Sequence, residues 1–336
     1  MSSPRARTVG FKRGERNVFF HVLTACNLAC RHCYINPREQ GTGMVSRQSL
    51  EKWLELFQDK TKDTNVIFLG GEPTMHPDLA YGIRCARNLG YSSITLDTNG
   101  FLFHNFLDKV KPDDLDFLSF SLDGPSPEIN DPLRGQGVFA TCSQNLQAAL
   151  AQGFNVSLIY TVSRNNIAHL HAMVPLLIQW GIKRFFIQVI GIRGKTALNG
   201  AAQWQVSPEE WLTKIPPVAA EAAAHGITTI FPKVFLEPPE KFECAGRVAE
   251  NYFIFPNGRV YQCPLCEDYP VNSYRIEENR LIENSGFTES RLFSLDIPEG
   301  CVINKLLQPD NLLYDAQGKP LHKISCCLLK QEMRGE

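Results

Sequence analysis

The chain has 336 residues, of which 43% are hydrophobic, and its 34 Lys and Arg residues nearly balance its 35 Asp and Glu residues. A chain of this length can bury one large core, or a core and a smaller companion, without cross-links. Neither charge gathers in long runs, so the sequence excludes the basic surface expected of a protein that binds nucleic acid or an anionic membrane. We expect a small or neutral substrate.

The amino-terminal segment, residues 1–14, is short and basic and lacks the apolar stretch of a signal peptide. No apolar run approaches the length that spans a membrane. We therefore expect a cytoplasmic protein. Thiols stay reduced in that compartment, so metal binding explains the eleven cysteines better than disulfides do.

From Asn17 onward, short β-branched and aromatic runs alternate with longer amphipathic stretches, a pattern typical of βα units around a parallel sheet. Six apolar runs are predicted as buried strands, at residues 17–24, 65–69, 93–98, 116–122, 155–162 and 184–190. Six units are fewer than the eight of a closed barrel. We therefore predict an α/β fold, an open partial (β/α)6 barrel, with the functional groups just after the strands.

Helix boundaries follow from capping residues. The first long helix is predicted to begin at Ser46, because apolar side chains at helical spacing follow it. Those side chains are Leu50, Trp53, Leu54 and Phe57. Later helices are predicted to end at glycines that suit the left-handed position after a helix. These glycines are Gly90, Gly153, Gly181 and Gly226.

The βα pattern breaks at residues 231–243, an irregular stretch that contains Pro232, Pro238 and Pro239. We therefore predict a barrel domain at residues 15–230 and a small α+β domain at residues 231–336. The clearest element of the second domain is a hairpin at residues 251–262, whose turn is Pro256-Asn257-Gly258.

Three cysteines, Cys26, Cys30 and Cys33, lie immediately after the first predicted strand. Three thiolates on one loop can hold an iron–sulfur cube and leave one iron open to a further ligand. The alternatives are a zinc site or three unrelated buried cysteines. Zinc knuckles usually pair one CxxC with another or with histidines, and the nearby sequence offers neither partner.

This CxxxCxxC spacing after a first strand resembles the signature of the radical S-adenosylmethionine (SAM) superfamily. The resemblance implies a 4Fe–4S cluster held by Cys26, Cys30 and Cys33, with the amino and carboxylate groups of SAM on the open iron. It also implies an oxygen-sensitive enzyme. A reductant such as flavodoxin or ferredoxin would supply the electron that cleaves SAM to methionine and a 5′-deoxyadenosyl radical.

The second strand runs into Gly70-Gly71-Glu72-Pro73, which resembles the GGEP motif of that superfamily. There the backbone meets the SAM amino group, and the resemblance implies SAM contacts at Gly70, Gly71 and Glu72. Glycines permit a close backbone approach, and a carboxylate can accept hydrogen bonds from an ammonium group. An ordinary Gly- and Pro-containing loop is the alternative.

The segment after the fourth strand resembles the SAM-binding stretch of sulfatase-maturating radical SAM enzymes. The resemblance implies SAM contacts at Ser121 and Arg134, and a guanidinium suits bidentate capture of the SAM carboxylate. Asp123 is either a third contact or an Asx-turn residue before Gly124. His32 either places its ring against the adenine or covers the cluster from solvent.

Three further polar residues sit on or at the ends of predicted strands, namely Thr98, Asn99 and Gln188. They can line the cleft, and Gln188 is taken as a SAM-site residue. A role in a turn or in the core is the alternative for each.

Six of the eleven cysteines lie from Cys244 onward. Cys244 and Cys263, with the hairpin glycine between them, resemble the opening element of SPASM and twitch domains, which implies an auxiliary iron–sulfur cluster. The rest of the SPASM cysteine pattern is missing, so we expect one auxiliary cluster. Cys266 and Cys301 are the next ligand candidates, and Cys326 or Cys327 can replace one of them. A zinc site built from Cys263, Cys266 and the late cysteines is the alternative.

The remaining cysteines and acids give smaller indications. Cys85 and Cys142 lie on helix faces and are predicted to be packing residues. Sulfatase-maturating enzymes place an acidic base directly after the hairpin cysteine, where this chain has Pro264. Formylglycine formation is therefore not expected, although Glu267 and Asp268 follow closely.

These patterns predict an enzyme that abstracts a hydrogen atom from an unreactive C–H bond. We expect a small metabolite that is epimerised or oxidised, and the alternatives are a SPASM-type peptide or protein maturase and a zinc-stabilised binding protein without catalysis. A cysteine left over from cluster binding can return a hydrogen atom to the substrate. Cys326 and Cys327 are the candidates, because neighbours on an extended segment point to opposite sides. Buried packing is the alternative.

Overall fold

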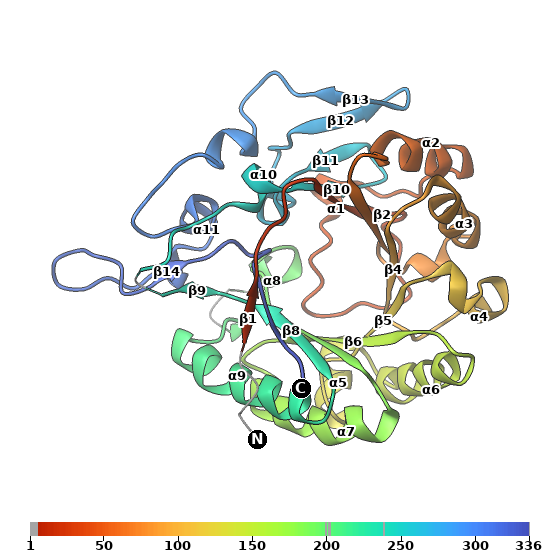
Figure 1. Cartoon of the computed structure of the whole chain (residues 1–336), viewed down its shortest axis with the longest axis horizontal. Helices are drawn as coiled ribbons and strands as arrows, with labels where there is room; N and C mark the ends of the chain where they lie inside the picture. The colour runs from red at the N-terminus through yellow and green to blue at the C-terminus, as the bar shows by residue number, and fades with distance from the viewer. Residues whose placement is uncertain (1–5, 199, 201–202, 238, 336) are drawn as a thin grey trace.

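Seven consecutive strands of one sheet run parallel in the computed structural model, which describes residues 6–198, 200, 203–237 and 239–335 (Figure 1). They are β2 (Glu15–His21), β3 (Asp63–Leu69), β4 (Ser93–Thr98), β5 (Phe117–Ser121), β6 (Val156–Val162), β7 (Arg184–Val189) and β8 (Thr228–Pro232). Each is parallel to the next, and the sheet curls into an open barrel with the larger helices outside it.

The partial barrel predicted from the sequence is confirmed, and the six predicted strands are β2 to β7. The sequence pattern missed β8, which pairs with β7 from Arg184 opposite Thr228 onward. Pro232 had marked this segment as an irregular linker. Proline cannot donate to a ladder, and Pro232 lies beyond the pairing of β8 with β7, which ends at Ile230.

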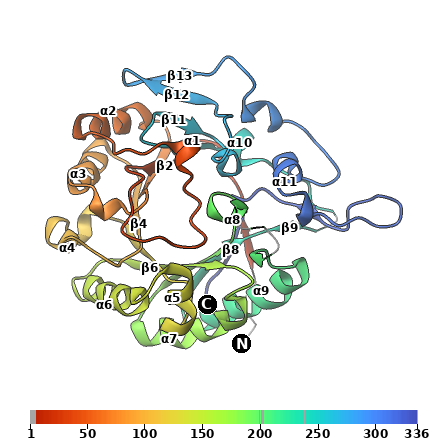
Figure 2. The same ribbon diagram turned by 180° about the vertical axis from the view of Figure 1, so that it is seen from behind.

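Helices connect these strands and cover the outer face of the sheet. The longer ones are α2 (Arg47–Phe57), α3 (Leu79–Leu89), α5 (Pro127–Arg134), α6 (Val138–Ala151), α7 (Met173–Trp180) and α9 (Pro208–Ala224). The short ones are α1 (Pro37–Gln40), α4 (Phe106–Lys109), α8 (Lys195–Leu198), α10 (Ala245–Val248) and α11 (Val302–Leu307). In Figure 2, the loop after β2 and helix α8 cross the middle of the barrel.

The predicted helix boundaries are confirmed. The Ser46 side chain caps α2 by accepting a hydrogen bond from the Ser49 backbone N–H at 3.1 Å, and the four apolar side chains of this helix are buried. Gly90 and Gly181 adopt the left-handed conformation directly after α3 and α7. Gly153 and Gly226, also at positive φ, follow one residue beyond the caps of α6 and α9.

Strands from the carboxyl-terminal part extend this sheet at both edges. On one side, β10 (Glu250–Ile254) lies parallel to β2, and β11 (Arg259–Tyr261), β12 (Tyr274–Glu277) and β13 (Arg280–Glu283) follow antiparallel. On the other side, β15 (Lys330–Met333) pairs with β8, and β1 (Arg7–Val9) pairs with β15. A separate pair joins β9 (Phe235–Leu236) to β14 (Lys323–Ile324).

The predicted hairpin is confirmed as β10 and β11, with Gly258 at φ +81° in the turn. The division between residues 230 and 231 stays a prediction, since strands from both sides of it share one sheet. Among the described residues, the largest apolar cluster takes side chains from both sides of this division. Phe19 of β2 packs on a second cluster, where its ring stacks on that of Phe253 with the centres 4.3 Å apart.

Some predictions concern residues that the structure does not describe. Residues 1–5 of the basic amino-terminal segment and Pro238 of the proline-rich stretch lie outside the described residues. Within the described part of the chain, no helix combines the length and the apolar character needed to cross a membrane.

Candidate active site

A cavity of about 1180 Å³ fills the barrel interior. Its walls are inward-facing side chains of the parallel strands, together with the loop after β2 and the carboxyl-terminal segment around Cys327. Many residues singled out in the sequence line it, namely Cys26, Cys30, His32, Cys33, Gly70, Gly71, Glu72, Thr98, Asn99, Ser121, Arg134 and Gln188. The structure therefore brings the three-cysteine loop and most predicted cofactor contacts to one space.

The three-cysteine loop lies directly against the Gly70-Gly71 turn. The Gly71 N–H donates to Leu23 O at 2.9 Å, and the Glu72 N–H donates to Ala25 O at 3.0 Å. A Cβ atom on Gly71 would overlap Ala25 O, and one on Gly70 would lie 2.5 Å from Leu23 O. Both glycines are therefore required for this turn to support the backbone just before Cys26.

Other contacts hold the far end of the same loop. The Lys195 backbone N–H donates to Cys33 O at 3.0 Å, and its Nζ donates to Cys30 O at 3.1 Å. The three cysteines form no disulfide. Burial raises the pKa of the Cys26 thiol to about 11, so in the metal-free protein this thiol is protonated at neutral pH.

Glu72 is fully buried, and its hydrogen bonds connect the glycine turn to β4 and, through Asn99, to the three-cysteine loop. Its Oε1 accepts hydrogen bonds from the hydroxyls of Thr74 at 2.6 Å and Thr98 at 2.7 Å, and its Oε2 accepts from the Asn99 N–H at 2.8 Å. The Asn99 side chain donates to Asn27 Oδ1 at 2.8 Å. Four protein donors thus reach the Glu72 carboxylate, three at Oε1 and one at Oε2, and Glu72 also borders the cavity.

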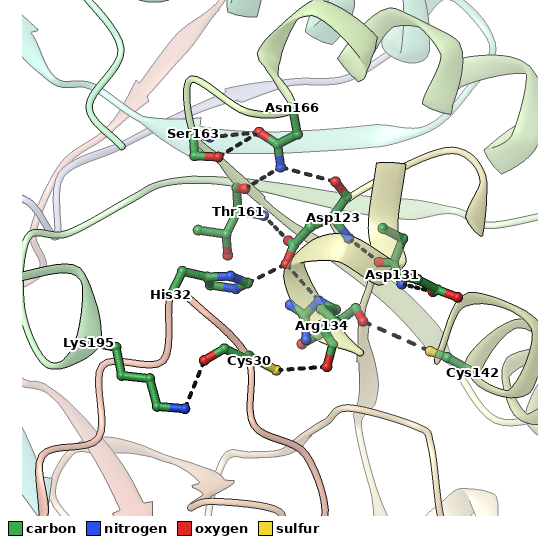
Figure 3. A network of polar contacts seen from close by, with 12 residues as sticks. Cys30, His32, Asp123, Asp131, Arg134, Cys142, Thr161, Ser163, Asn166 and Lys195 are labelled. Carbon is green, nitrogen blue, oxygen red and sulfur yellow. Dashed lines mark hydrogen bonds and ion pairs between the residues drawn. The ribbon is translucent and has the colours of Figure 1, made fainter. Parts of the chain in front are cut away.

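Asp123 forms the centre of a buried charged group (Figure 3). Arg134 Nε donates to its Oδ2 at 2.6 Å, the Thr161 N–H donates to its Oδ1 at 2.7 Å, and His32 Nε2 lies 3.1 Å from its Oδ2. Burial alone would raise the pKa of Asp123. The Arg134 guanidinium and His32 outweigh that effect and hold the pKa well below its usual range.

The Asx-turn alternative for Asp123 is therefore wrong, because its carboxylate bonds to groups 11 and 38 residues further along the chain. Arg134, the last residue of α5, borders the cavity and uses its Nε for Asp123. Among the described contacts, no hydrogen bond engages its two terminal amino groups. They suit a carboxylate of a bound molecule.

Sequence reasoning missed Asp97, which faces the cavity from β4. Burial raises the pKa of Asp97 to about 7, although the Ser119 hydroxyl lowers this pKa in part. Ser119 Oγ lies 2.7 Å from Ser157 Oγ. An acidic residue inside a buried, otherwise alternating strand was the signal that could have found it.

The six late cysteines lie near one another, and Cys327 among them lines the cavity. The nearby Cys326 thiol raises the pKa of Cys244, and the Cys266 thiol raises the pKa of Cys263. Cys263 and Cys326 both raise the pKa of Cys327, and Cys301 lies within electrostatic reach of Cys263 and Cys326. The structure therefore gathers every predicted candidate ligand of the second cluster.

The expectation that Cys326 and Cys327 lie on an extended segment is wrong. The Leu329 N–H donates to Cys326 O at 2.8 Å, so the pair opens a turn and is not extended. Both thiols lie among the late cysteines. Cys327 lines the cavity, whereas the Cys326 side chain is buried, with 7% of its surface exposed. Cys142 is fully buried in the core and Cys85 packs against it, as predicted.

The described side chains do not form the zinc site considered from the sequence. No three His, Cys, Asp or Glu side chains among the described residues converge closely enough to hold a single ion. Zinc needs four ligands at about 2.0 to 2.3 Å from one point.

An open barrel with three cysteines on a loop beside its cavity is an arrangement suited to holding an iron–sulfur cluster. Residues 21–177 match the model of the Radical SAM superfamily, so this part of the chain is a radical SAM domain. A radical SAM domain implies a 4Fe–4S cluster with SAM.

Two curated relatives illustrate the likeness. The chain is 30% identical over 190 residues to the AdoMet-dependent heme synthase of Oleidesulfovibrio alaskensis, an alignment that covers 55% of this chain and 48% of that protein. It is 27% identical over 293 residues to the mycofactocin maturase MftC of Mycobacterium tuberculosis, covering 79% of this chain and 69% of that protein. The chain thus spans about half the length of the first relative.

Among solved structures, SuiB of Streptococcus suis bound to S-adenosylmethionine has the same fold. The TM-score is 0.60 at 16% identity, over 76% of this chain and 61% of SuiB. At this identity the likeness concerns the fold alone.

Proposed function

We propose that this chain reductively cleaves SAM at a 4Fe–4S cluster held by Cys26, Cys30 and Cys33, and removes a hydrogen atom from a substrate in the barrel cavity. One observation carries the proposal: three free thiols on one loop border the same cavity as the glycine turn and Arg134. An external reductant such as flavodoxin or ferredoxin would deliver the electron.

The fit of the cofactor rests on the donors around the loop. When bound, the cluster and SAM supply an electron transfer that splits the sulfonium and yields a 5′-deoxyadenosyl radical that takes the hydrogen atom. The terminal amino groups of Arg134 would hold the SAM carboxylate, with Asp123 orienting the guanidinium through Nε. The Gly70-Gly71 backbone would receive the SAM ammonium.

His32, Ser121 and Gln188 would complete the SAM pocket, since all three border the cavity. The His32 ring is held by Asp123 at one edge and lies 6.4 Å from the Trp204 ring, tilted by 56°. That placement fixes the imidazole beside Arg134, where it can face the adenine.

The substrate is proposed to be a small metabolite that is epimerised or oxidised. The cavity of about 1180 Å³ exceeds the roughly 300 to 1,000 Å³ of a usual ligand pocket, so SAM and a small molecule fit together. Cys327 borders this space and is the proposed hydrogen donor for an epimerisation. In an oxidation, the substrate electron would instead pass to the auxiliary cluster of the late cysteines.

The test is anaerobic reconstitution with iron and sulfide, followed by iron counting and a 5′-deoxyadenosine assay. Wild-type protein should form 5′-deoxyadenosine from SAM and dithionite. The Cys26→Ala/Cys30→Ala/Cys33→Ala variant should form none and yet keep the iron of the late cysteines. Cys85→Ala is the matched control, because this cysteine packs against the core away from both sites. Production of 5′-deoxyadenosine by the triple variant would refute the proposal.

Maturation of a peptide is the second candidate. It is favoured by the likeness to a mycofactocin maturase, which extends over 79% of this chain. Mass spectrometry separates the two candidates when reconstituted enzyme is given deuterated water and either metabolite extracts or precursor peptides. Substrate-dependent 5′-deoxyadenosine formation with peptides alone would favour maturation over metabolite chemistry.

A further inference from the structure

One loop touches both cysteine sites. It consists of residues 190–194 after β7 together with Lys195, the first residue of α8, and is called the β7 exit loop. Its residues hydrogen-bond to the three-cysteine loop on one side and to the segment Pro264–Cys266 and the two acids that follow it on the other.

On the three-cysteine side, the contacts are to backbone carbonyls. Lys195 donates from its backbone N–H to Cys33 O and from Nζ to Cys30 O. Gly194 has φ +57°, and a Cβ atom there would lie 2.6 Å from Cys33 O. Only glycine fits so close to the cysteine loop, and the position of one loop therefore fixes the position of the other.

On the side of the late cysteines, Arg193 makes the main contacts. Its Nη1 donates to Pro264 O at 2.6 Å and to Glu267 Oε2 at 2.6 Å. Pro264 follows Cys263 and Glu267 follows Cys266, so the guanidinium holds both ends of the segment between these two candidate ligands. The Gly194 N–H donates to Asp268 Oδ2 at 2.8 Å.

The guanidinium also connects back to the residue after Cys33. Arg193 lies over the Tyr34 ring, 4.6 Å from its centre, and Tyr34 Oη lies 2.7 Å from His21 Nε2. Asn36 Nδ2 donates to Asp268 Oδ1 at 2.6 Å. Glu267 is 2% exposed, so loss of Arg193 would leave a buried carboxylate without its charge partner.

We propose that Arg193 is a positioning residue that couples the two cysteine sites. Cluster binding at the late cysteines fixes the position of residues 264–268. Through its contacts with this segment, Arg193 then restricts the motion of the β7 exit loop and of the three-cysteine loop that it contacts. This coupling rests on one part of the proposed function, namely that the late cysteines bind an iron–sulfur cluster. Arg193 itself touches neither group of thiols in this role.

The experiment uses the full-length Cys26→Ala/Cys30→Ala/Cys33→Ala protein, in which iron can load only at the late cysteines. Amide hydrogen exchange at residues 31, 33, 194 and 195 is measured before and after anaerobic loading with iron and sulfide. Loading should slow exchange at these amides about fivefold or more, the lower end of typical coupling between sites. When Arg193→Met is introduced into the same protein, iron loading should no longer slow exchange at these amides, while the iron content stays the same.

Two further variants separate coupling from general damage. The Arg193→Lys variant can keep the ion pair with Glu267, but lysine lacks the planar guanidinium that reaches both Pro264 O and Glu267. Iron loading of this variant should therefore slow amide exchange by an intermediate amount. Arg87→Met is the matched control, because Arg87 pairs with Asp116 at 2.9 Å on the outer side of the barrel. It should preserve the full slowing, and exchange in β4 to β6 should be the same in all variants.

The outcomes distinguish the two proposals. If the triple variant binds no iron, the auxiliary site of the proposed function fails and the coupling falls with it. If iron binds and the four amides do not respond, or respond equally in Arg193→Met, the coupling is refuted while the proposed function stands. Should Arg193→Met not fold, Glu267→Gln removes the same ion pair and takes its place in the comparison.

Discussion

The two cysteine sites are built in opposite ways. The first consists of one short loop, and buried polar braces around Glu72 and Asp123 support it from the barrel. The second gathers cysteines from four separate segments, at residues 244, 263–266, 301 and 326–327, and short strands and turns hold these segments together. We therefore expect the first site to be disrupted when one of these buried polar contacts is removed. We expect the second site to be disrupted when one of its segments loses contact with the next.

The largest effect is expected from removing a brace. Asp123→Ala leaves the buried Arg134 guanidinium without its partner and removes the acceptor of the Thr161 N–H. Unpairing a buried charge typically costs roughly 3 to 5 kcal/mol. Urea unfolding of the metal-free protein measures the loss of free energy of unfolding.

A matched ion pair in the second part of the chain provides the contrast. Arg275 and Glu277 lie 3.6 Å apart with both side chains more than half exposed. Glu277→Ala should leave the unfolding free energy unchanged within error, because exposed pairs contribute little. Equal effects of the two substitutions would contradict the idea that buried braces support the first site.

Two glycine substitutions should damage one site each. Gly71→Ala forces the turn away from Ala25 O, and Gly300→Ala, at φ +89°, forces the chain away from Ile324 O next to Cys301. Each is expected to cost about 1 to 3 kcal/mol of local strain. Iron and sulfide counts after reconstitution should show that Gly71→Ala loses iron from the first site only, and Gly300→Ala from the second only. Loss of both clusters in both variants would mean that the sites are not separable.

A further effect concerns pH. Burial raises the pKa of Asp97 from its usual 3.8 to about 7, so between these values the folded protein holds a proton that the unfolded chain releases. Stability therefore falls as pH rises through this range, by at most about 1.4 kcal/mol per pH unit, and levels off above pH 7. Asp97→Asn should remove this slope.

Unfolding free energies at pH 5, 6, 7 and 8 measure the difference between Asp97→Asn and wild type. Other titrating groups contribute equally to both proteins and cancel. A difference that does not change with pH would show that the Asp97 carboxyl titrates as it does in water.

The sequence was informative where the partners are close along the chain. Cys26, Cys30 and Cys33 share one loop, and the strand ends that carry the glycine turn and Ser121 follow from apolar runs. The arrangement of the six late cysteines could not be read, because turns and pairings far apart in sequence create it. The turn at Cys326–Leu329 contains no Gly, Pro, Asn or Asp that would have marked it.

Long-range partners explain the other gaps. Asp123 precedes a glycine, which favours a local turn, yet its partners are Arg134 and Thr161. Arg193 carries no motif, and its acceptors lie 71 and 74 residues away. Charge pairing of this kind depends on which strands become neighbours, and the sequence pattern alone does not determine that.

The parallel pairing of β2 with β10 also governs when the barrel can form during synthesis. Arg16 on β2 bonds to Glu250 on β10, 234 residues later, and β1 meets β15 across 325 residues. Such distant pairings fold slowly, because a large loop must close before they form. As the chain leaves the ribosome, β2 keeps one unpaired edge until β10 appears, and unpaired edges invite association with other chains. The nascent chain therefore carries its first cysteine loop beside an open strand for most of its synthesis.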